Sequence, residues 1–511
     1  MTLAALQQQP VLVLGLGASG LAMARWCARQ GAQVTVADTR SAPPQLATLQ
    51  SELPSVRFVC TEFNAALVTE SGAQLILKSP GLPPAQLVLL AAAAKMGTVP
   101  IGGELIMFAQ ALDDLRQSQG YQPQVLAVTG TNGKTTVTAM TGQLVHRAGK
   151  TVAVAGNIGP TLLDTLALHI DAASLPDVWV IELSSFQLAD SIPTTAPLPR
   201  FNATAACVLN LTQDHLDWHG TMAAYAQAKA HIFGHQTRVL LNRDDAQVLA
   251  MLPASAKGRA VRPYLSFGAD MPQRPGDFGI EVVGGVAWLV RAMERDPTYK
   301  VRKGQQSEDL HIQRLIPAEA LRIRGRHNAV NALAALALAS TAGCTLAPML
   351  YGLREYRGEP HRVQSIGVVR DIEYFDDSKG TNVGATVAAL KGLGADRKLV
   401  VILGGDGKGQ DFSPLKAPAS QFVRAVVLIG RDAGVIRDAL HGSDVTLTDA
   451  ASLPDAVVQA AALAHAGDAV LLSPACASLD MFDNYLHRAR VFFDAVSSLA
   501  QDAGVTLEGS A

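Results

Sequence analysis

The segment VLAVTGTNGKTT combines an apolar run with a loop of the composition that binds phosphate. Gly130 and Gly133 free backbone N–H groups to surround phosphate oxygens, because glycine lets the chain approach a ligand closely. Lys134 is placed to reach the β- and γ-phosphates of a nucleotide, and Thr135 is placed to bind Mg²⁺. The residue five positions before Gly133 is not glycine, so the loop is a shortened variant of the Walker pattern. A plain glycine-containing turn is the alternative interpretation.

Other polar residues follow apolar runs further along the chain. Glu182 ends the run VWVIE, where a carboxylate could hold Mg²⁺ facing the loop. Asp214, His215 and Asp217 lie in DHLDWH, and Lys229 lies in an expected helix just beyond. A surface carboxylate at 182 and a hydrogen-bonded structural histidine at 215 are the alternatives. Together with the phosphate-binding loop, these residues favour a nucleotide and metal site.

The start of the chain carries a second glycine-rich loop. The run VLVLGLGASG reads as a buried strand that enters Gly15, Gly17 and Gly20, whose G-x-G-x-x-G spacing suits a diphosphate at a helix N-terminus. Asp38 ends a second expected strand, at the position of a ribose-binding carboxylate in dinucleotide folds. A nicotinamide-dependent dehydrogenase would explain these residues and leave GTNGKTT without a purpose.

The composition indicates the class of protein. The chain has 511 residues, 49% hydrophobic and 17% charged, which is enough to bury several cores and too long for one domain. A formal net charge of -2 gives no electrostatic reason to expect nucleic acid or an anionic membrane as a partner. Five scattered cysteines form no C-x-x-C pair, which argues against a disulfide framework or a zinc site. Apolar runs stay below about 18 residues and no export signal is visible, so we expect a cytoplasmic protein without a membrane span.

Strand and helix signals alternate along the chain in three blocks. Apolar runs alternate with alanine-rich helical stretches, which is the pattern of parallel strands joined by helices. We therefore expect an α/β protein of three domains, residues 1–102, 103–358 and 359–511. The polar stretch DDLRQSQGYQPQ reads as the connection into the second domain. Residues 255–320 read as short antiparallel strands without identifiable chemistry.

The order and wording of these segments resemble the ATP-dependent Mur ligases, which build the cytoplasmic precursor of peptidoglycan. The resemblance covers nearly the whole chain, through GTNGKTT (130–136), GNIG (156–159), ELSSFQL (182–188), DHLDWH (214–219), YAQAK (225–229), GRHNAVNALAA (325–335) and PHR (360–362). Within the family, the members that add D-glutamate are similar in DDSKGTN (376–382), LGGDGKGQDFSPL (403–415) and LLSPACASLD (471–480).

The resemblance implies a Rossmann-like UDP-binding domain, a central P-loop ATPase-type domain and a C-terminal Rossmann-like domain. In the implied reaction, ATP phosphorylates the carboxylate of UDP-N-acetylmuramoyl-L-alanine, and the amine of D-glutamate attacks the acyl phosphate. GLGASG would then hold the diphosphate of a UDP substrate and no nicotinamide. Sister ligases for another amino acid and folate-type glutamate ligases are the nearest alternatives, and a non-catalytic nucleotide-binding protein is a further one. We expect a monomer.

The resemblance also assigns the catalytic, metal and ATP residues. One Mg²⁺ would use Thr135 and Glu182, and a second would use His215 with Lys229 as a carbamate, which replaces a repelling cation by an anionic oxygen ligand. An unmodified ammonium at Lys229 is the alternative. The catalytic residues would be Lys134, Glu182, His215 and Lys229. The ATP-binding residues would be Gly130, Thr131, Asn132, Gly133, Lys134, Thr135, Thr136, Asn328 and Asn331, with Arg362 and Asp377 closing over ATP from the third domain.

Two further groups of residues follow from the same resemblance. The UDP substrate would contact Ala18, Ser19, Asp38, Thr39, Arg40, Gly81 and Asn157. D-Glutamate would contact Lys379, Thr381, Lys408, Ser478 and Tyr485, because cations and hydroxyls suit a dianionic amino acid. Tyr485 stands where the family usually has phenylalanine, which weakens that one assignment. An extra stretch within residues 255–320 also departs from the family pattern and is expected to decorate the surface.

Overall fold

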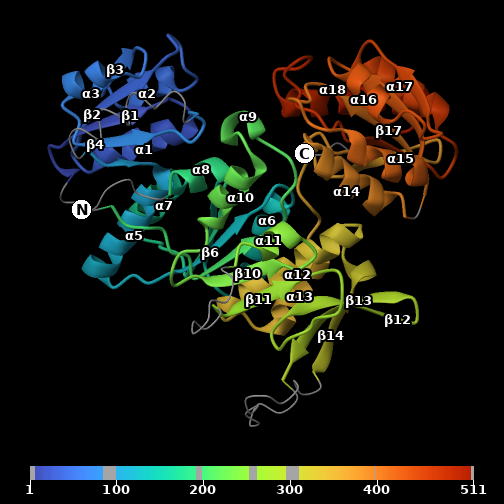
Figure 1. Ribbon diagram of the computed structural model, residues 1–511, viewed down its shortest axis with the longest axis horizontal. Coiled ribbons are helices and arrows are strands. Elements are labelled where there is room, and N and C mark those ends of the chain that lie inside the picture. The colour runs from blue at the N-terminus through green and yellow to red at the C-terminus, as the bar shows by residue number, and fades with distance from the viewer. Residues whose placement is uncertain are drawn as a thin grey trace.

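The computed structural model describes residues 6–83, 99–191, 198–252, 262–294, 310–395 and 397–507. Among these residues the strands form three sheets, of five, nine and six strands. Figure 1 shows the N-terminal domain in blue and the C-terminal domain in orange to red, both on the same side of the central domain. The expected three-domain α/β fold is confirmed, whereas the exact borders between the domains stay predictions.

The N-terminal sheet is parallel, with strand order β3-β2-β1-β4-β5. Because β1 lies between β2 and β4, the loops that follow Leu14, Asp38 and Lys78 meet at the carboxyl edge of the sheet, the usual position of a ligand site in such folds. The elements are β1 Pro10–Leu14, α1 Ala18–Arg29, β2 Gln33–Asp38, α2 Leu46–Glu52, β3 Arg57–Cys60, α3 Ala65–Ser71, β4 Leu75–Lys78 and β5 Ile101–Gly102.

The central sheet has the order β14-β13-β12-β11-β10-β9-β6-β8-β7, and β6 therefore lies between β8 and β9. Its first elements are α5 Glu104–Gln119, β6 Gln124–Thr129, α6 Lys134–Arg147, β7 Val152–Gly156, α7 Leu162–Asp171, β8 Val178–Glu182, α8 Ser185–Ala189, β9 Ala205–Val208, α9 Leu216–His219 and α10 Met222–Ala230. The remaining ones are β10 Arg238–Asn242, α11 Ala246–Leu249, β11 Tyr264–Phe267, β12 Phe278–Val283, β13 Val286–Met293, β14 His311–Pro317, the 3-10 helix η3 Ala318–Ala320, α12 Arg326–Thr341 and α13 Leu346–Glu355.

Two expectations for this domain were wrong in part. Strand β11 pairs in parallel with β10, so the segment expected as antiparallel strands becomes antiparallel only from β12 through β14. The reason is that β11 extends the parallel sheet, and direction is not encoded in an apolar run. The stretch DDLRQSQ belongs to helix α5 and is not a connection. Residues 253–261 and 295–309 of the expected segment lie outside the described residues.

The C-terminal sheet has the order β15-β16-β20-β17-β18-β19, and only its edge pair β15–β16 is antiparallel. The carboxyl ends of β16, β20 and β17 are neighbours, so the loops after Asp376, Leu472 and Gly404 converge. The elements are β15 Gln364–Val369, β16 Ile372–Asp376, α14 Val383–Leu393, β17 Leu399–Gly404, η4 Ser413–Leu415, α15 Lys416–Phe422, β18 Val423–Ile429, α16 Ala433–Ala439, β19 Thr446–Asp449, α17 Leu453–Leu463, β20 Ala469–Leu472 and α18 Tyr485–Asp502.

Ion pairs join the N-terminal domain to the central domain. Arg25 on α1 lies 3.1 Å from Asp164 on α7, measured between Nη1 and Oδ2. Lys78 at the end of β4 lies 2.8 Å from Asp190 after α8, and both side chains are largely buried. These contacts fix the carboxyl edge of the N-terminal sheet beside the central one. Within the described part of the chain, each helix is too short or too polar to cross a membrane.

Gly20→Ala should destabilise the N-terminal domain. A Cβ at this position would lie 1.9 Å from the carbonyl oxygen of Gly15, so helix α1 and its loop would have to separate. Overpacking of this kind costs roughly 1–3 kcal/mol of the free energy of unfolding. Calorimetric unfolding should show the loss, with Gly434→Ala as the control, because nothing lies within 4 Å of a Cβ at 434. Equal unfolding temperatures for the two variants would contradict the close approach.

Candidate active site

The phosphate-binding loop leaves β6 between two strand ends of the central sheet. Strands β8 and β9 pair with β6, so the loop runs between Glu182 and the residues that follow Val208. Gly133 caps helix α6 with a φ of 82°, a left-handed conformation that favours glycine. A Cβ at 133 would lie 2.8 Å from Oδ1 of Asn331. The loop therefore needs this glycine both for its backbone angle and for the approach of helix α12.

Lys134 and Lys229 share one backbone acceptor in the loop. The Nζ atoms of Lys134 and Lys229 donate to the carbonyl oxygen of Gly130 at 3.1 Å and 2.8 Å. Lys134 also donates to the carbonyl oxygen of Thr131 at 2.9 Å. Burial lowers the pKa of Lys134, although the nearby Glu182 carboxylate opposes the shift. Both amines therefore lie at the loop, where the phosphates of a nucleotide would bind.

Lys229 is the more deeply buried of the two, with a side chain only 1% exposed. Its Nζ lies 3.3 Å from Oγ1 of Thr129 and 4.7 Å from the ring centroid of Tyr225. Burial, together with the adjacent Lys134, holds the pKa of Lys229 well below the usual lysine range. The neutral amine is thereby favoured, and this is the form that reacts with carbon dioxide.

Glu182 has one carboxylate oxygen with a partner and one without. Its Oε1 accepts from Nδ2 of Asn157 at 2.8 Å, whereas its Oε2 is buried and has no hydrogen-bond partner among the described residues. Leaving such an oxygen unpaired costs free energy that a bound cation would recover. The side chain is 2% exposed, so the alternative of a surface carboxylate is wrong.

His215 lies in the loop that follows β9, in a left-handed backbone conformation with a φ of 54°. Its ring meets Phe186 edge-on at 4.7 Å between centroids, and its Nε2 lies 3.6 Å from Oδ2 of Asp214. Burial lowers the pKa of His215 despite Asp214, which favours the neutral imidazole that ligates metals. Among the described residues, no three His, Cys, Asp or Glu side chains form a metal-binding group. The two magnesium sites therefore stay predictions.

Seven of the eleven residues expected to hold ATP line one cavity of about 130 Å³ between the central and C-terminal domains, whereas Gly130, Thr131, Lys134 and Thr135 lie outside its lining. Nδ2 of Asn331 donates to Oδ1 of Asn328 at 3.1 Å, which confirms that both lie on one face of α12. Arg362 reaches across the domain boundary and donates to Oγ1 of Thr135 at 2.6 Å. Burial raises the pKa of Asp377 to about 7, although a hydrogen bond from Ser473 opposes the shift. The cavity is lined by Asn132, Gly133, Thr136, Asn328, Asn331, Arg362, Asp377 and their neighbours.

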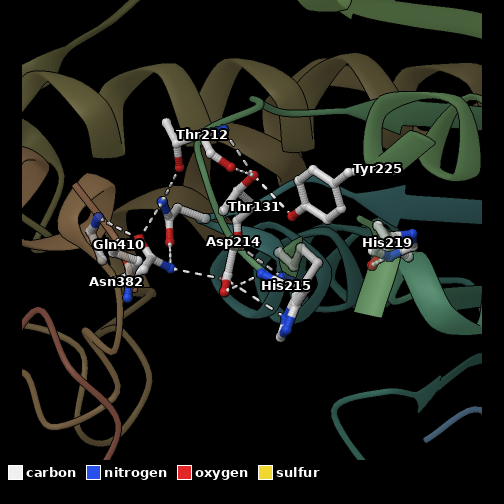
Figure 2. Close-up of polar contacts among 12 residues, drawn as sticks. Thr131, Thr212, Asp214, His215, His219, Tyr225, Asn382 and Gln410 are labelled. Atoms are coloured by element: carbon white, nitrogen blue, oxygen red, sulfur yellow. Dashed lines mark hydrogen bonds and ion pairs between the residues drawn. The ribbon is translucent and has the colours of Figure 1, made fainter. Parts of the chain in front are cut away.

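A reciprocal amide pair connects the phosphate-binding loop to the C-terminal domain (Figure 2). The side chains of Asn132 and Asn382 donate to each other, at 3.1 Å in both directions. Asn382 Nδ2 also lies 3.3 Å from Oδ2 of Asp214, and its Oδ1 caps helix α14. A Cβ at Gly384 would lie 2.6 Å from Oγ1 of Thr212. The amino end of α14 is thus seated directly on the loop, an arrangement that the sequence motifs did not reveal.

The UDP-side residues lie together at the carboxyl edge of the N-terminal sheet. Ala18 and Ser19 begin helix α1, Asp38 ends β2, and residues 39–40 follow that strand. The carboxylate of Asp38 accepts from the N–H of Leu16 at 2.7 Å and from the backbone and guanidinium of Arg40. Burial disfavours its ionisation, but these donors outweigh burial and lower the pKa of Asp38 to about 2. Asp38 thus organises the loop itself, and its direct contact with a nucleotide stays a prediction.

The remaining two UDP-side residues lie at other strand ends. Gly81 follows strand β4, and nothing lies within 4 Å of a Cβ built there. Asn157 follows β7 in the central domain and is bound to Glu182 through both its backbone N–H and its side chain. Asn157 therefore lies beside the candidate metal carboxylate, and its contact with the substrate stays a prediction.

The residues expected to hold D-glutamate come from three converging loops of the C-terminal domain. Nζ of Lys379 lies 3.9 Å from the ring centroid of Tyr485, so the unusual tyrosine faces this group. Asp406 pairs with Ala477 as an isolated bridge and accepts from the N–H of Lys408 at 2.9 Å, which brings the loop of Lys408 beside that of Ser478. Thr381 lies in the first of these loops, just before α14.

Arg488 is a residue that the sequence motifs missed. It is 1% exposed, and its guanidinium donates to the carbonyl oxygens of Cys476 at 3.1 Å and Ser378 at 2.9 Å. Burial lowers the pKa of Arg488 to about 10. The side chain therefore ties two of the loops that carry candidate D-glutamate residues. An arginine in an amphipathic helix is usually interpreted as a surface residue, so no pattern in the sequence pointed to its burial.

Models of three Mur ligase domains match this chain. The MurD-like N-terminal domain of Mur ligases matches residues 9–102, and the Mur ligase middle domain matches residues 128–339. The glutamate ligase domain of Mur ligases matches residues 361–476. The chain belongs to the Mur ligase family.

Full-length relatives make the comparison more specific. The UDP-N-acetylmuramoylalanine–D-glutamate ligase of Albidiferax ferrireducens is 64% identical over 511 residues, covering 99% of each chain. The ligases of the same name from Polaromonas sp. and Burkholderia cenocepacia are 57% and 56% identical, and each alignment covers 98% of this chain. These alignments cover 100% and 99% of the respective relatives.

Solved structures of other Mur ligases share the fold. MurF ligase from Thermotoga maritima in complex with ADP has a TM-score of 0.56 at 15% identity, covering 98% of this chain and 97% of that one. UDP-N-acetylmuramate-alanine ligase MurC from Thermotoga maritima has a TM-score of 0.54 at 20% identity, covering 96% and 99%. At these identities the likeness concerns the three-domain architecture.

Asn382→Ala should weaken the seating of the C-terminal domain on the loop. The variant loses the reciprocal pair with Asn132, and each hydrogen bond contributes about 0.5–1.5 kcal/mol, so the KM for ATP should rise roughly tenfold. Small-angle scattering should show a larger radius of gyration. Asn64→Ala is the control, because Asn64 also caps a helix but lies in the N-terminal domain. An unchanged KM and radius would show that the pair does not hold the domains together.

Proposed function

We propose that this chain joins D-glutamate to UDP-N-acetylmuramoyl-L-alanine through an acyl phosphate, with ADP and phosphate as the other products. The observation that carries the assignment is the 55–64% identity, over essentially the full chain, to ligases named for that reaction. A sister ligase specific for another amino acid is not favoured, because the relatives named here share one acceptor in their names.

In the proposed reaction, a carboxylate oxygen of the UDP substrate attacks the γ-phosphorus of ATP, and ADP leaves. The amine of D-glutamate then attacks the acyl carbon, loses a proton and expels phosphate, which leaves the amide. Both steps gather negative charge on phosphoryl and acyl oxygens. Lys134 and the amino end of α6 lie where they can stabilise that charge, since the first N–H groups of a helix have no partner within it.

The residues present fit a requirement for Mg²⁺. The unpaired Oε2 of Glu182 is a hard oxygen donor, and Thr135 provides a hydroxyl at the start of α6. These two residues would hold one ion, and His215 with Lys229 would hold a second. When bound, Mg²⁺ would neutralise phosphate charge and orient the phosphoryl group.

Carbamylation of Lys229 would remove the electrostatic conflict between the two neighbouring lysine amines. The neutral Nζ attacks carbon dioxide, forms an N–C bond and releases a proton, which yields an anionic carbamate. The buried position of Lys229 favours the neutral amine that this step needs. The product would place a negative oxygen beside Lys134 in place of a second amine, and it would supply an oxygen ligand of the kind that Mg²⁺ prefers.

The substrates would occupy the two flanking domains. The UDP moiety would lie at the amino end of α1, where the helix N-terminus suits a diphosphate. The two carboxylates of D-glutamate would lie among the cations and hydroxyls of the C-terminal loops. The adenosine end of ATP would lie beside Asn328 and Asn331, and Arg362 would close over the nucleotide from the C-terminal domain.

Phosphate release should require UDP-N-acetylmuramoyl-L-alanine and D-glutamate together. The rate of phosphate release with L-glutamate should be at least a hundredfold lower. Its inverted centre cannot direct both carboxylates to the C-terminal loops while it aims the amine at the acyl carbon. A coupled phosphate assay with each amino acid and each UDP precursor tests this. Equal rates with the two enantiomers would refute the assignment.

Lys134→Ala, which removes the loop cation, should abolish turnover in a folded protein.

Lys229→Ala should abolish most of the ligase activity, and a small carboxylate such as acetate should restore part of it. The added anion would supply the oxygen that the carbamate provides in the native enzyme. The rate of phosphate release as a function of acetate concentration measures the effect, with chloride at equal ionic strength as the salt control. Lys134→Ala is the matched variant that acetate should not rescue. Failure of every small carboxylate, together with a crystal structure of the active enzyme that shows an unmodified lysine, would eliminate the carbamate.

A further inference from the structure

A buried ion pair joins the N-terminal domain to the central domain. Nζ of Lys78 lies 2.8 Å from Oδ2 of Asp190, and the two side chains are 6% and 14% exposed. Burial raises the pKa of Asp190 to about 6, although Lys78 opposes the shift, so the carboxylate is still ionised at neutral pH. Taking two charges out of water costs much of the free energy that their attraction returns. What the pair fixes is therefore the position of one domain relative to the other, more than the stability of either.

On the N-terminal side, the ammonium is built into the loops expected to hold UDP. Lys78 ends strand β4, which pairs in parallel with β1. Its Nζ also donates to the carbonyl oxygen of Leu82 at 3.2 Å and so closes the loop that contains Gly81. A Cβ at Gly15 would lie 3.0 Å from Cβ of Ser79, so the glycine-rich loop packs against the same segment. Lys78 therefore holds the loop after β4 beside the loop after β1.

On the central side, the partner carboxylate ends the short helix that starts beside Glu182. The N-cap of α8 is Ser184, two residues after Glu182, and its C-cap is Asp190. Ser184 and Gln187 form a reciprocal capping box, which fixes the first turn of the helix. A shift of Asp190 would therefore move a helix that is joined directly to the candidate metal carboxylate.

The same ammonium faces the loop that carries His215. Nζ of Lys78 lies over the ring of Trp218, 5.5 Å from its centroid, a favourable position for a cation. Phe186 of α8 contacts the rings of Trp218 and His215, with its centroid 5.0 Å from the first and 4.7 Å from the second. Lys78 is thus connected to both segments of the central domain that carry candidate metal ligands.

We propose that Lys78 is a positioning residue which, through its pair with Asp190, sets the distance between the UDP site and the phosphate-binding loop. The inference rests on the proposed function, in which one substrate places its diphosphate at α1 and its alanyl carboxylate at that loop. Domains of one chain otherwise move relative to each other by default. A change in their separation would misplace the carboxylate while each site stays intact, and a misplacement of about 1 Å lowers a rate roughly a hundredfold.

Kinetics and binding of Lys78→Met test the proposal, because methionine keeps most of the aliphatic stem and removes the charge. The kcat with UDP-N-acetylmuramoyl-L-alanine should fall roughly tenfold or more with little change in KM, since only the reacting end of the substrate is misplaced. Calorimetric titration should show that the Kd of UDP alone and the Kd of a non-hydrolysable ATP analogue each change by less than about twofold. A loss of UDP affinity as large as the loss of kcat would show that Lys78 only supports the UDP loop, and it would overturn the proposal. An unchanged kcat would do the same.

Arg25→Met is the matched control, because Arg25 also joins the two domains but its ion pair with Asp164 is partly exposed. This variant should keep kcat within about twofold of the native value. Asp190→Asn should reproduce the effect of Lys78→Met, and the double variant should be no worse than either single variant, as expected for two residues that act as a unit. The double variant also avoids a lone buried carboxylate, so it gives the result if Lys78→Met alone does not fold. Losses that add in the double variant would contradict positioning by the pair.

The native chain separates this inference from the proposed function. Absence of phosphate release with UDP-N-acetylmuramoyl-L-alanine and D-glutamate in the native chain would remove the proposed function and this inference together. An active native chain with an equally active Lys78→Met variant would overturn this inference alone.

Discussion

Two buried lysines that donate to the same carbonyl oxygen of Gly130 create the constraint on which the rest of the site depends. Two buried amines that share one acceptor lie close together, so they cannot both be charged without large electrostatic repulsion. Partial relief comes from Glu182 and Asp214, whose charges favour the protonated forms of both. The repulsion between the two lysines is also relieved when a phosphate binds at the loop, or when Lys229 loses its charge. Both events belong to the proposed reaction.

Parallel sheets place the partners of these lysines. Strand β6 lies between β8 and β9, so Glu182 and the loop of His215 flank the phosphate-binding loop although they are distant in sequence. The same topology in the N-terminal sheet brings the loop after β1 beside Asp38. Each motif follows the carboxyl end of a strand, which is where open α/β sheets bind ligands. In each sheet the fold thus brings separate sequence motifs to one edge.

The sequence predicted what is local and missed what depends on the docking of domains. Spacing along the chain encodes a glycine loop, a strand-end carboxylate and two asparagines one helical turn apart. Asn328 and Asn331 do lie on one face of α12, as their spacing predicts. The pairing of Asn132 with Asn382 joins residues of two domains, and no periodicity encodes it. The direction of β11 depends on which strand it joins. The domain borders, monomeric state, cytoplasmic location and carbamylation stay predictions, because the described contacts do not test them.

The Asn382 side chain links the phosphate-binding loop to the loop that carries candidate D-glutamate residues. Its Oδ1 caps helix α14 and also accepts from Asn132, so the start of the helix is set by the position of the phosphate-binding loop. Lys379 and Thr381 lie directly before this cap, in the loop that Arg488 ties to Cys476. A phosphate that moves the loop must therefore move the amide pair, the cap and the candidate D-glutamate residues together. Through these contacts, the position of the candidate D-glutamate residues depends on how the C-terminal domain is seated on the phosphate-binding loop.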